Sequence, residues 1–302
     1  MIVEFAIGGI VAAAAIAFVL GYRAFRIPRP RKLEMPGNRR ALLYQLQDSP
    51  RPTLIVLHPY SGDALSTARY SGFLQAAIPC GFNVVVPDAI GHEWHDTPDE
   101  TPFYDNDIEL LGSLVERLVA QGIADPKRIF IAGISNGGMM AFAIACARPD
   151  LFAGIGTISG GMPSHVQENC RLNKPMPLVM IHGDADDVLS YAGGDVGDPS
   201  GFFRTTAGVE QTAALFARTH EGSASREPKR TQIRDGKRVI ERIDWSNGSG
   251  YPLVTVVKVL GGGHDVIGWR APIPAFFALP PRGPATAAAI VQRFAEVNSD
   301  QS

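Results

Sequence analysis

A serine between two glycines is the residue of this sequence best suited to chemistry. Gly133-Ile-Ser135-Asn-Gly137 matches the pattern G-x-S-x-G, with an apolar β-branched run at 129–131 before it and helix-compatible residues at 139–145 after it. In this strand–turn–helix context the serine lies on a strained turn, and glycines flank it because side chains there would clash. We therefore predict that Ser135 is a nucleophile; an ordinary Gly-rich turn is the alternative.

Three carboxylates that could orient a catalytic histidine follow the apolar run at 178–181. They lie in the segment His182-Gly-Asp-Ala-Asp-Asp187. A triad needs a carboxylate to orient the histidine and to stabilise its cation, and in hydrolases with this serine turn it stands between Ser and His along the chain. We predict Asp186 for this role, with Asp187 as second choice and Asp184 as a residue that holds the turn. A solvated acidic loop is the alternative.

The expected base of such a triad is His264. Of the seven histidines, it is the one that follows both Ser135 and Asp186 at the end of a predicted strand, at 253–260. The three glycines before it let the backbone turn sharply and bring the imidazole to the edge of the sheet. A lone histidine is often structural, but the chain order favours a catalytic role here.

Two backbone N–H groups are candidates for stabilising the oxyanion of a tetrahedral intermediate. One belongs to Asn136, at the start of the helix that follows the serine, where the helix dipole is positive. The other would come from the loop after the strand at 53–57, which reads His58-Pro-Tyr60. Because proline has no N–H, Tyr60 is the expected donor; an ordinary turn is the alternative reading of this loop.

Some side chains in loops after predicted strands are expected to contact the substrate, because such loops carry the binding residues of α/β folds. They are His58, Trp94 and Trp269. For Trp269 and the nearby Phe276-Phe277 pair, packing in the core is an equal alternative. The segment His92-Glu-Trp-His95 is not a H-E-x-x-H metal motif, because only two residues separate its histidines. We therefore expect no metal ion and no organic cofactor.

The rest of the chain alternates between strand-like and helix-like segments. Strands are predicted at 41–47, 53–57, 83–87, 129–131, 152–158, 178–181 and 253–260, and helices at 69–79, 107–121, 139–145, 209–220 and 286–297. This alternation predicts an α/β protein with a mostly parallel central sheet and helices on both faces. The highly charged segment at 221–241 is expected to be an exposed excursion.

Composition excludes some classes of partner. A hydrophobic content of 45%, a charged content of 19% and a net charge of −2 are typical of a globular protein without a basic footprint, so nucleic acid is not an expected partner. The three cysteines, Cys80, Cys146 and Cys170, fit neither a dense disulfide framework nor a zinc site. The sequence leaves open whether two of them form a disulfide and the third is a free thiol.

The N-terminal segment is apolar from Phe5 to Leu20 and is followed by several basic residues. It lacks the basic start of a secretory signal, so we expect an uncleaved membrane anchor over 1–22, with a signal-like segment as the alternative. A basic, Pro-rich linker is expected over 23–38 and a folded catalytic domain over 39–302. The positive-inside rule would place that domain on the cytoplasmic side.

Together these motifs resemble a known esterase family. Segments 133–139, 149–153, 181–186, 191–194 and 262–264 occur in the order found in the catalytic domain of polyhydroxybutyrate depolymerases and feruloyl esterases, the LpqC-like group. The resemblance covers most of the globular part of the chain. It implies the α/β-hydrolase fold and places the nucleophile at Ser135, the acid at Asp186 and the base at His264. The loop at His58-Pro-Tyr60 departs from the His-Gly of the family.

The residues and the resemblance predict a serine carboxylester hydrolase that works through an acyl-enzyme. The expected substrate is a small or oligomeric ester of the hydroxyalkanoate or aromatic type. An acyltransferase or peptidase with the same triad is an alternative, because the fold does not fix the acceptor. A catalytically inactive, membrane-tethered binding protein is another. Most members of the family are exported, so the domain is expected to be membrane-anchored or exported to the cell envelope, with its side of the membrane open.

Overall fold

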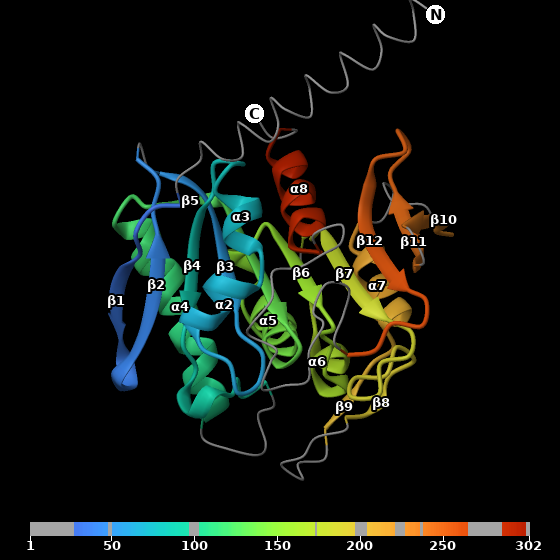
Figure 1. The fold of residues 1–302 in the computed structure, drawn as a ribbon, viewed down its shortest axis with the longest axis horizontal. Helices are drawn as coiled ribbons and strands as arrows, with labels where there is room; N and C mark the ends of the chain where they lie inside the picture. Colours follow the sequence, from blue (N-terminus) through green and yellow to red (C-terminus); the bar gives the residue numbers. More distant parts are fainter. Residues whose placement is uncertain are drawn as a thin grey trace, which may run out of the picture.

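The computed structural model describes residues 27–47, 50–96, 103–172, 174–196, 204–220, 227–235, 238–264 and 286–299. Its main strands are β1 (Arg31–Met35), β2 (Arg39–Tyr44), β3 (Arg51–Leu57), β4 (Asn83–Pro87), β5 (Ala124–Ile134), β6 (Gly154–Ile158), β7 (Leu178–Gly183), β10 (Lys229–Asp235), β11 (Arg238–Ser246) and β12 (Pro252–Val259). They form one sheet in the order β1-β2-β4-β3-β5-β6-β7-β12-β11-β10 (Figure 1).

The centre of this sheet is parallel and its two edges are antiparallel. Strands β4, β3, β5, β6, β7 and β12 run parallel to their neighbours within this group. At one edge β1 and β2 are antiparallel, and at the other β11 and β10 are antiparallel. The predicted α/β architecture with a mostly parallel sheet is therefore confirmed.

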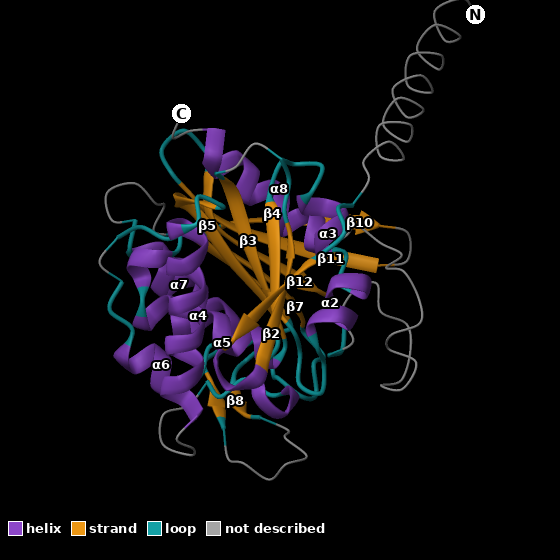
Figure 2. Cartoon of the chain, turned by 90° about the vertical axis from the view of Figure 1, so that its left-hand side faces the viewer, coloured by secondary structure: helices purple, strands orange, loops and turns teal. Residues whose placement is uncertain are grey.

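Helices cover both faces of the sheet (Figure 2). One face carries α4 (Phe103–Ala120), α5 (Asn136–Ala147), α6 (Ser164–Asn169) and α7 (Val209–Arg218), and the other carries α2 (Ala64–Tyr70), α3 (Phe73–Ala77) and α8 (Thr286–Ser299). In β3, Ile55 and Leu57 face the first group, whereas Leu54 and Val56 face the second. Because successive side chains of a strand point to opposite faces, a sheet covered on both sides needs a continuous apolar run.

The linker predicted over 23–38 is wrong from residue 31 onward, whereas residues 27–30 form no helix or strand. Residues Arg31–Met35 form β1, which pairs antiparallel with β2. Leu33 and Met35 are buried in the core, whereas Lys32 and Glu34 are exposed. This alternation is the strand signal, and the surrounding prolines and basic residues hid it. The folded domain begins at β1, before Arg39.

The segment at 221–241, predicted to be an exposed excursion, is exposed along β10 but forms regular strand structure in its described part. Strands β10 and β11 form an antiparallel hairpin that extends the sheet beyond β12. Lys229, Arg230 and Arg234 are exposed on this edge strand. Charged side chains on an edge strand discourage pairing with another chain, so the composition that resembled a loop is that of a protected sheet edge.

The single helix predicted at 69–79 is replaced by α2 and α3, which are separated at Ser71 and Gly72. Gly72 has φ +80°, a left-handed conformation that ends the first helix. Helix α2 begins earlier than predicted because Asp63 caps it, accepting a hydrogen bond from the Ser66 N–H. The other predicted strands and helices overlap observed elements, with ends shifted by a few residues.

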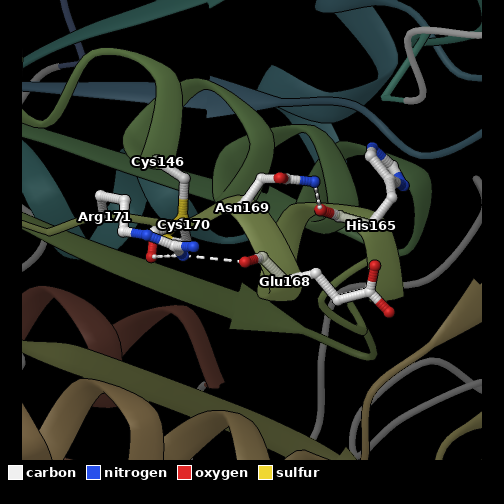
Figure 3. Close-up of a disulfide and its surroundings, with 6 residues drawn as sticks. All are labelled: Cys146, His165, Glu168, Asn169, Cys170 and Arg171. Atoms are coloured by element: carbon white, nitrogen blue, oxygen red, sulfur yellow. Dashed lines mark hydrogen bonds between the residues drawn. A yellow bond between two sulfur atoms is a disulfide. The ribbon is translucent and has the colours of Figure 1, made fainter.

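A disulfide joins Cys146, in the last turn of α5, to Cys170, just after α6 (Figure 3). Arg171 donates to the carbonyl oxygens of Glu168 and Cys170 and so satisfies acceptors at the end of α6. Cys80 is free and exposed. The arrangement of one bridge and one thiol, which the sequence left open, is the one present.

The predicted membrane anchor at 1–22 lies outside the described residues. Among the residues that the structure describes, none of the helices is both long and apolar enough to cross a bilayer. The anchor therefore stays a prediction from sequence.

Candidate active site

Ser135 lies on a tight turn between β5 and α5. Its backbone has φ +52° and ψ −121°, a conformation that residues other than glycine rarely adopt. A Cβ on Gly133 would overlap the backbone of Gly137, and a Cβ on Gly137 would overlap the carbonyl oxygen of His58. The Ser135 N–H donates to the carbonyl oxygen of Ile158 at 2.9 Å. The sharp turn expected from G-x-S-x-G is present, and the two glycines are required by close backbone contacts.

Ser135, His264 and Asp186 lie in one hydrogen-bonded chain. Ser135 Oγ is 2.9 Å from His264 Nε2, and His264 Nδ1 is 2.9 Å from Asp186 Oδ2. Because Nδ1 faces a carboxylate, it carries the imidazole proton, and Nε2 is left to accept from the serine hydroxyl. Strands β5, β6, β7 and β12 are parallel neighbours, so the loops that follow them meet at one edge of the sheet.

The Asp186 carboxylate is buried and has several donors. Its Oδ1 accepts from the N–H groups of Val188 (3.0 Å) and Leu189 (2.8 Å), and His182 Nε2 lies 3.3 Å from its Oδ2. Burial by itself raises the pKa of Asp186, but hydrogen bonds from His182 and His264 outweigh it and hold the pKa below the ordinary value of an aspartate. The group therefore stays ionised beside the imidazole.

The other two acidic candidates have different surroundings. Asp184 Oδ1 accepts from the Gly261 N–H at 2.6 Å, so it ties the loop after β7 to the loop after β12. This is a structural role, as predicted, but between two loops and not within its own turn. Asp187 is exposed. Of the three carboxylates, the structure brings only Asp186 to His264 within the described residues.

The two predicted oxyanion donors lie on segments that contact each other. The loop that carries Tyr60 begins at His58, whose carbonyl oxygen lies against Gly137, the second residue of α5. Among the described residues, no acceptor is bound to the backbone N–H of Tyr60 or of Asn136. By contrast, the Ser61 N–H donates to the His92 carbonyl oxygen and the Gly62 N–H donates to the Pro59 carbonyl oxygen, each at 2.9 Å. Both groups are therefore available to a ligand.

The side chain of Asn136 makes contacts that sequence reasoning missed. Its Oδ1 accepts from the Trp94 N–H at 2.8 Å, and its Nδ2 donates to the Trp94 carbonyl at 2.9 Å and to Asp96 Oδ2 at 3.1 Å. Arg204 pairs with Glu93 at 2.8 Å and lies 3.6 Å from Asp96. The residue after the nucleophile is thus clamped to the loop after β4. No spacing motif signals this contact.

The side chains of His58 and Trp94 are inaccessible from the surface, which contradicts their predicted role as substrate-binding residues. Both side chains are fully buried. His58 Nδ1 donates to the Pro59 carbonyl at 2.8 Å, its Nε2 accepts from the Ala89 N–H at 3.0 Å, and Trp94 Nε1 donates to the His58 carbonyl at 3.1 Å. Burial lowers the pKa of His58, and the hydrogen bond that Nε2 accepts from Ala89 also favours the neutral ring. The pair supports the loop that presents Tyr60.

Tyr60 itself has an exposed side chain, with 47% of its surface accessible. Trp269 and the Phe276-Phe277 pair lie outside the described residues, so their predicted contacts are not placed. Among the described residues, the Tyr60 ring is therefore accessible at the surface, on the loop that carries a predicted oxyanion donor.

The two histidines of the His92–His95 segment lie in separate hydrogen bonds. His92 Nδ1 is 2.7 Å from the Gly62 carbonyl oxygen, and His95 Nδ1 is 3.0 Å from Asp107 Oδ2. Within the described chain, no three histidine, cysteine or acidic side chains converge as metal ligands would. These histidines hold the loop after β4 in place.

Comparison with known proteins identifies relatives of this chain. The family described as Phospholipase/Carboxylesterase matches residues 93–198. The NocK protein of Nocardia uniformis subsp. tsuyamanensis, whose name places it among the esterases, is 31% identical over 265 residues, which cover 80% of this chain and 75% of NocK. Feruloyl esterase B of Piromyces equi is 26% identical over 72% of this chain and 40% of its own length. A poly(3-hydroxybutyrate) depolymerase of Ralstonia pickettii is 33% identical over 37% of this chain and 26% of its own length.

Two solved structures of esterases share this architecture. The acetyl xylan esterase from Aspergillus awamori gives a TM-score of 0.54 at 14% identity, covering 78% of this chain and 93% of that enzyme. Esterase PE8 gives a TM-score of 0.51 at 16% identity, covering 89% and 98%. At such identities the likeness shows the fold alone, and that fold is the α/β-hydrolase fold, as the resemblance predicted.

Proposed function

The chain belongs to the esterase family of α/β-hydrolases that is related to polyhydroxybutyrate depolymerases and feruloyl esterases, and we propose that its carboxylesterase activity runs through Ser135, His264 and Asp186. The observation that carries this assignment is the continuous hydrogen-bonded chain from Ser135 Oγ through the His264 ring to the Asp186 carboxylate. Nucleophile, base and orienting acid are within hydrogen-bond reach of one another, which is the geometry that nucleophilic catalysis needs.

In the proposed reaction, His264 Nε2 takes the proton of Ser135 as Oγ attacks the ester carbonyl carbon. The negative oxygen of the tetrahedral intermediate accepts hydrogen bonds from the backbone N–H groups of Tyr60 and Asn136. Asp186 stabilises the imidazolium. The bond to the alcohol breaks, the alcohol leaves with the proton from His264, and Ser135 is acylated. Water then attacks the acyl carbon as His264 takes its proton. The bond from that carbon to Ser135 Oγ breaks, His264 returns the proton to Oγ, and the carboxylic acid is released.

We propose small or oligomeric esters of the hydroxyalkanoate or aromatic type as substrates. The names of the feruloyl esterase and poly(3-hydroxybutyrate) depolymerase relatives support this class. The exposed ring of Tyr60, beside one of the proposed oxyanion donors, favours an aromatic or apolar acyl group.

The proposal is tested by turnover of defined esters. The full-length protein would be assayed with p-nitrophenyl esters of increasing acyl length, with methyl ferulate and with 3-hydroxybutyrate oligomers, beside its Ser135→Ala variant. We expect hydrolysis by the parent protein and background rates for the variant. Equal rates in both would remove Ser135 from the reaction, and an inert parent protein would favour a binding function.

We also propose that the catalytic domain resides in an oxidising compartment, exported or anchored outside the cytoplasm. The Cys146–Cys170 disulfide supports this, because such bonds persist where thiols are not kept reduced. A thiol-reactive maleimide added to denatured protein from cells should label one cysteine before reduction and all three after it. Three labelled cysteines before reduction would place the domain in a reducing compartment.

A further inference from the structure

One buried side chain touches the proposed triad without taking part in the reaction. His182 lies at the end of β7, four residues before Asp186, and its side chain is 1% exposed. Its Nε2 is 2.7 Å from the Leu189 carbonyl oxygen and 3.3 Å from Asp186 Oδ2. Because both neighbours are acceptors, Nε2 carries the proton and can donate to both. We propose that His182 is a positioning residue, which holds the Asp186 carboxylate in the orientation that pairs it with His264.

The hydrogen bonds form a closed ring that supports this role. Leu189 donates its N–H to Asp186 Oδ1, and its carbonyl oxygen accepts from His182 Nε2. The same Nε2 lies against Asp186 Oδ2, the carboxylate oxygen nearer to His264. Donors on both oxygens therefore fix the plane of the carboxylate, and His182 is the member of the ring that is not supplied by the loop itself.

The ring of His182 is held from its other side as well. Tyr191 packs edge-on against it, with ring centroids 6.0 Å apart, and the Tyr191 hydroxyl donates to Glu210 Oε1 at 3.0 Å. Lys258, on the neighbouring strand β12, lies over the Tyr191 ring at 4.7 Å. His182 Nδ1 is buried and has no hydrogen-bond partner among the described residues. The polar contacts of the imidazole are thus made through Nε2.

This inference rests on the proposed function, and the test separates the two. His182→Phe keeps a ring of similar size but removes the donor, whereas His182→Gln can place an amide N–H near the position of Nε2. We expect kcat of His182→Phe to fall about 10- to 100-fold, the order of loss that follows a small misplacement of a catalytic group. KM should change little, and His182→Gln should recover most of the loss. His220→Phe is a matched control, because His220 is also buried but has no bond to the triad.

A spectroscopic readout distinguishes positioning from general loss of stability. The downfield proton resonance of the hydrogen bond between His264 Nδ1 and Asp186 should be present in the parent protein, in His182→Gln and in His220→Phe. It should move or disappear in His182→Phe. Rates would be normalised to active sites titrated with an organophosphate, so that unfolded molecules do not count.

Each failure has its own signature. Unchanged kcat per active site and an unchanged resonance in His182→Phe would overturn the positioning role while the esterase assignment stands. An inactive parent protein would overturn the proposed function, and the resonance would still test the contact. If His182→Phe does not fold, His182→Asn replaces it, because the asparagine side chain is too short to reach Asp186. A His182→Asn variant as active as His182→Gln would also overturn the proposal.

Discussion

The two halves of the proposed active site are held in different ways. The nucleophile half, formed by the turn around Ser135 and the loop at 58–60, depends on close backbone contacts that leave no room for a side chain at Gly133 or Gly137. The acid–base half depends on side-chain hydrogen bonds between the loops after β7 and β12. Added side-chain volume should therefore disrupt the nucleophile half. Loss of a hydrogen-bond donor or acceptor should disrupt the acid–base half.

The largest effect is expected from volume added to the nucleophile half. Gly137→Ala would place a Cβ on the carbonyl oxygens of His58 and Leu57, which cannot move without displacing β3. We expect loss of soluble folded protein or of all activity, measured by yield, circular dichroism and ester hydrolysis. Gly248→Ala is the control, because a Cβ there meets no atom within 4 Å. A folded, active Gly137→Ala variant would contradict the account of this half.

The next effect comes from a change of chemistry in the acid–base half without a change of volume. Asp186→Asn should fold normally but lose about 10⁴-fold in kcat, because an amide does not stabilise the imidazolium and can favour the wrong tautomer. Steady-state kinetics would show it as a fall in kcat with KM little changed. The exposed Asp187 gives the control: Asp187→Asn should keep the parent rate, and a large loss there would move the acid to Asp187.

A smaller effect is expected where the nucleophile half uses a side chain. Asn136→Ala keeps the backbone N–H that we assign to the oxyanion but removes the bonds to Trp94 and Asp96. We expect kcat to fall about 10- to 100-fold through a misplaced donor, with the active-site serine still reactive towards an organophosphate. A parent-like kcat would mean that the backbone alone fixes this donor.

The smallest effect concerns the pH dependence of stability. Burial lowers the pKa of His58, so below the ordinary histidine pKa of about 6.5 the unfolded chain binds a proton that the folded chain does not. The free energy of unfolding should therefore fall as the pH drops below about 6.5. Urea unfolding of His58→Gln across this range should show a weaker dependence of the unfolding free energy on pH. The dependence that remains is expected from His220, because burial lowers the pKa of His220 as well. An unchanged slope would show that His58 is not kept neutral.

The same contrast explains what the sequence revealed. The turn of the nucleophile half is formed by consecutive residues, so G-x-S-x-G and its flanking elements predict the turn at Ser135. In the acid–base half, Ser135 and His264 are 129 positions apart, and Asp186 and His264 are 78 positions apart. Chain order and strand ends were the clues there, and they selected the residues that the structure brings together.

Contacts between distant loops gave no such clue. The clamp on Asn136 joins it to residues 40 and 42 positions away, and His182 was noted as part of a motif but not as a neighbour of the carboxylate. Strands β1 and β10 were missed because edge strands carry the charged and proline-rich composition that is also typical of loops. The position of His58 and Trp94 after strands does not tell burial from exposure, so the sequence gives no sign that both side chains are buried.

The most direct test of the central claim is covalent labelling of the full-length protein with diethyl p-nitrophenyl phosphate, which phosphorylates an activated serine irreversibly. Mass spectrometry of the intact protein and of its peptides would count and locate the label. We predict one diethylphosphoryl group, on Ser135, with much slower labelling of Asp186→Asn and none of Ser135→Ala. Label on another residue, or ester hydrolysis by a protein whose Ser135 stays unlabelled, would contradict it.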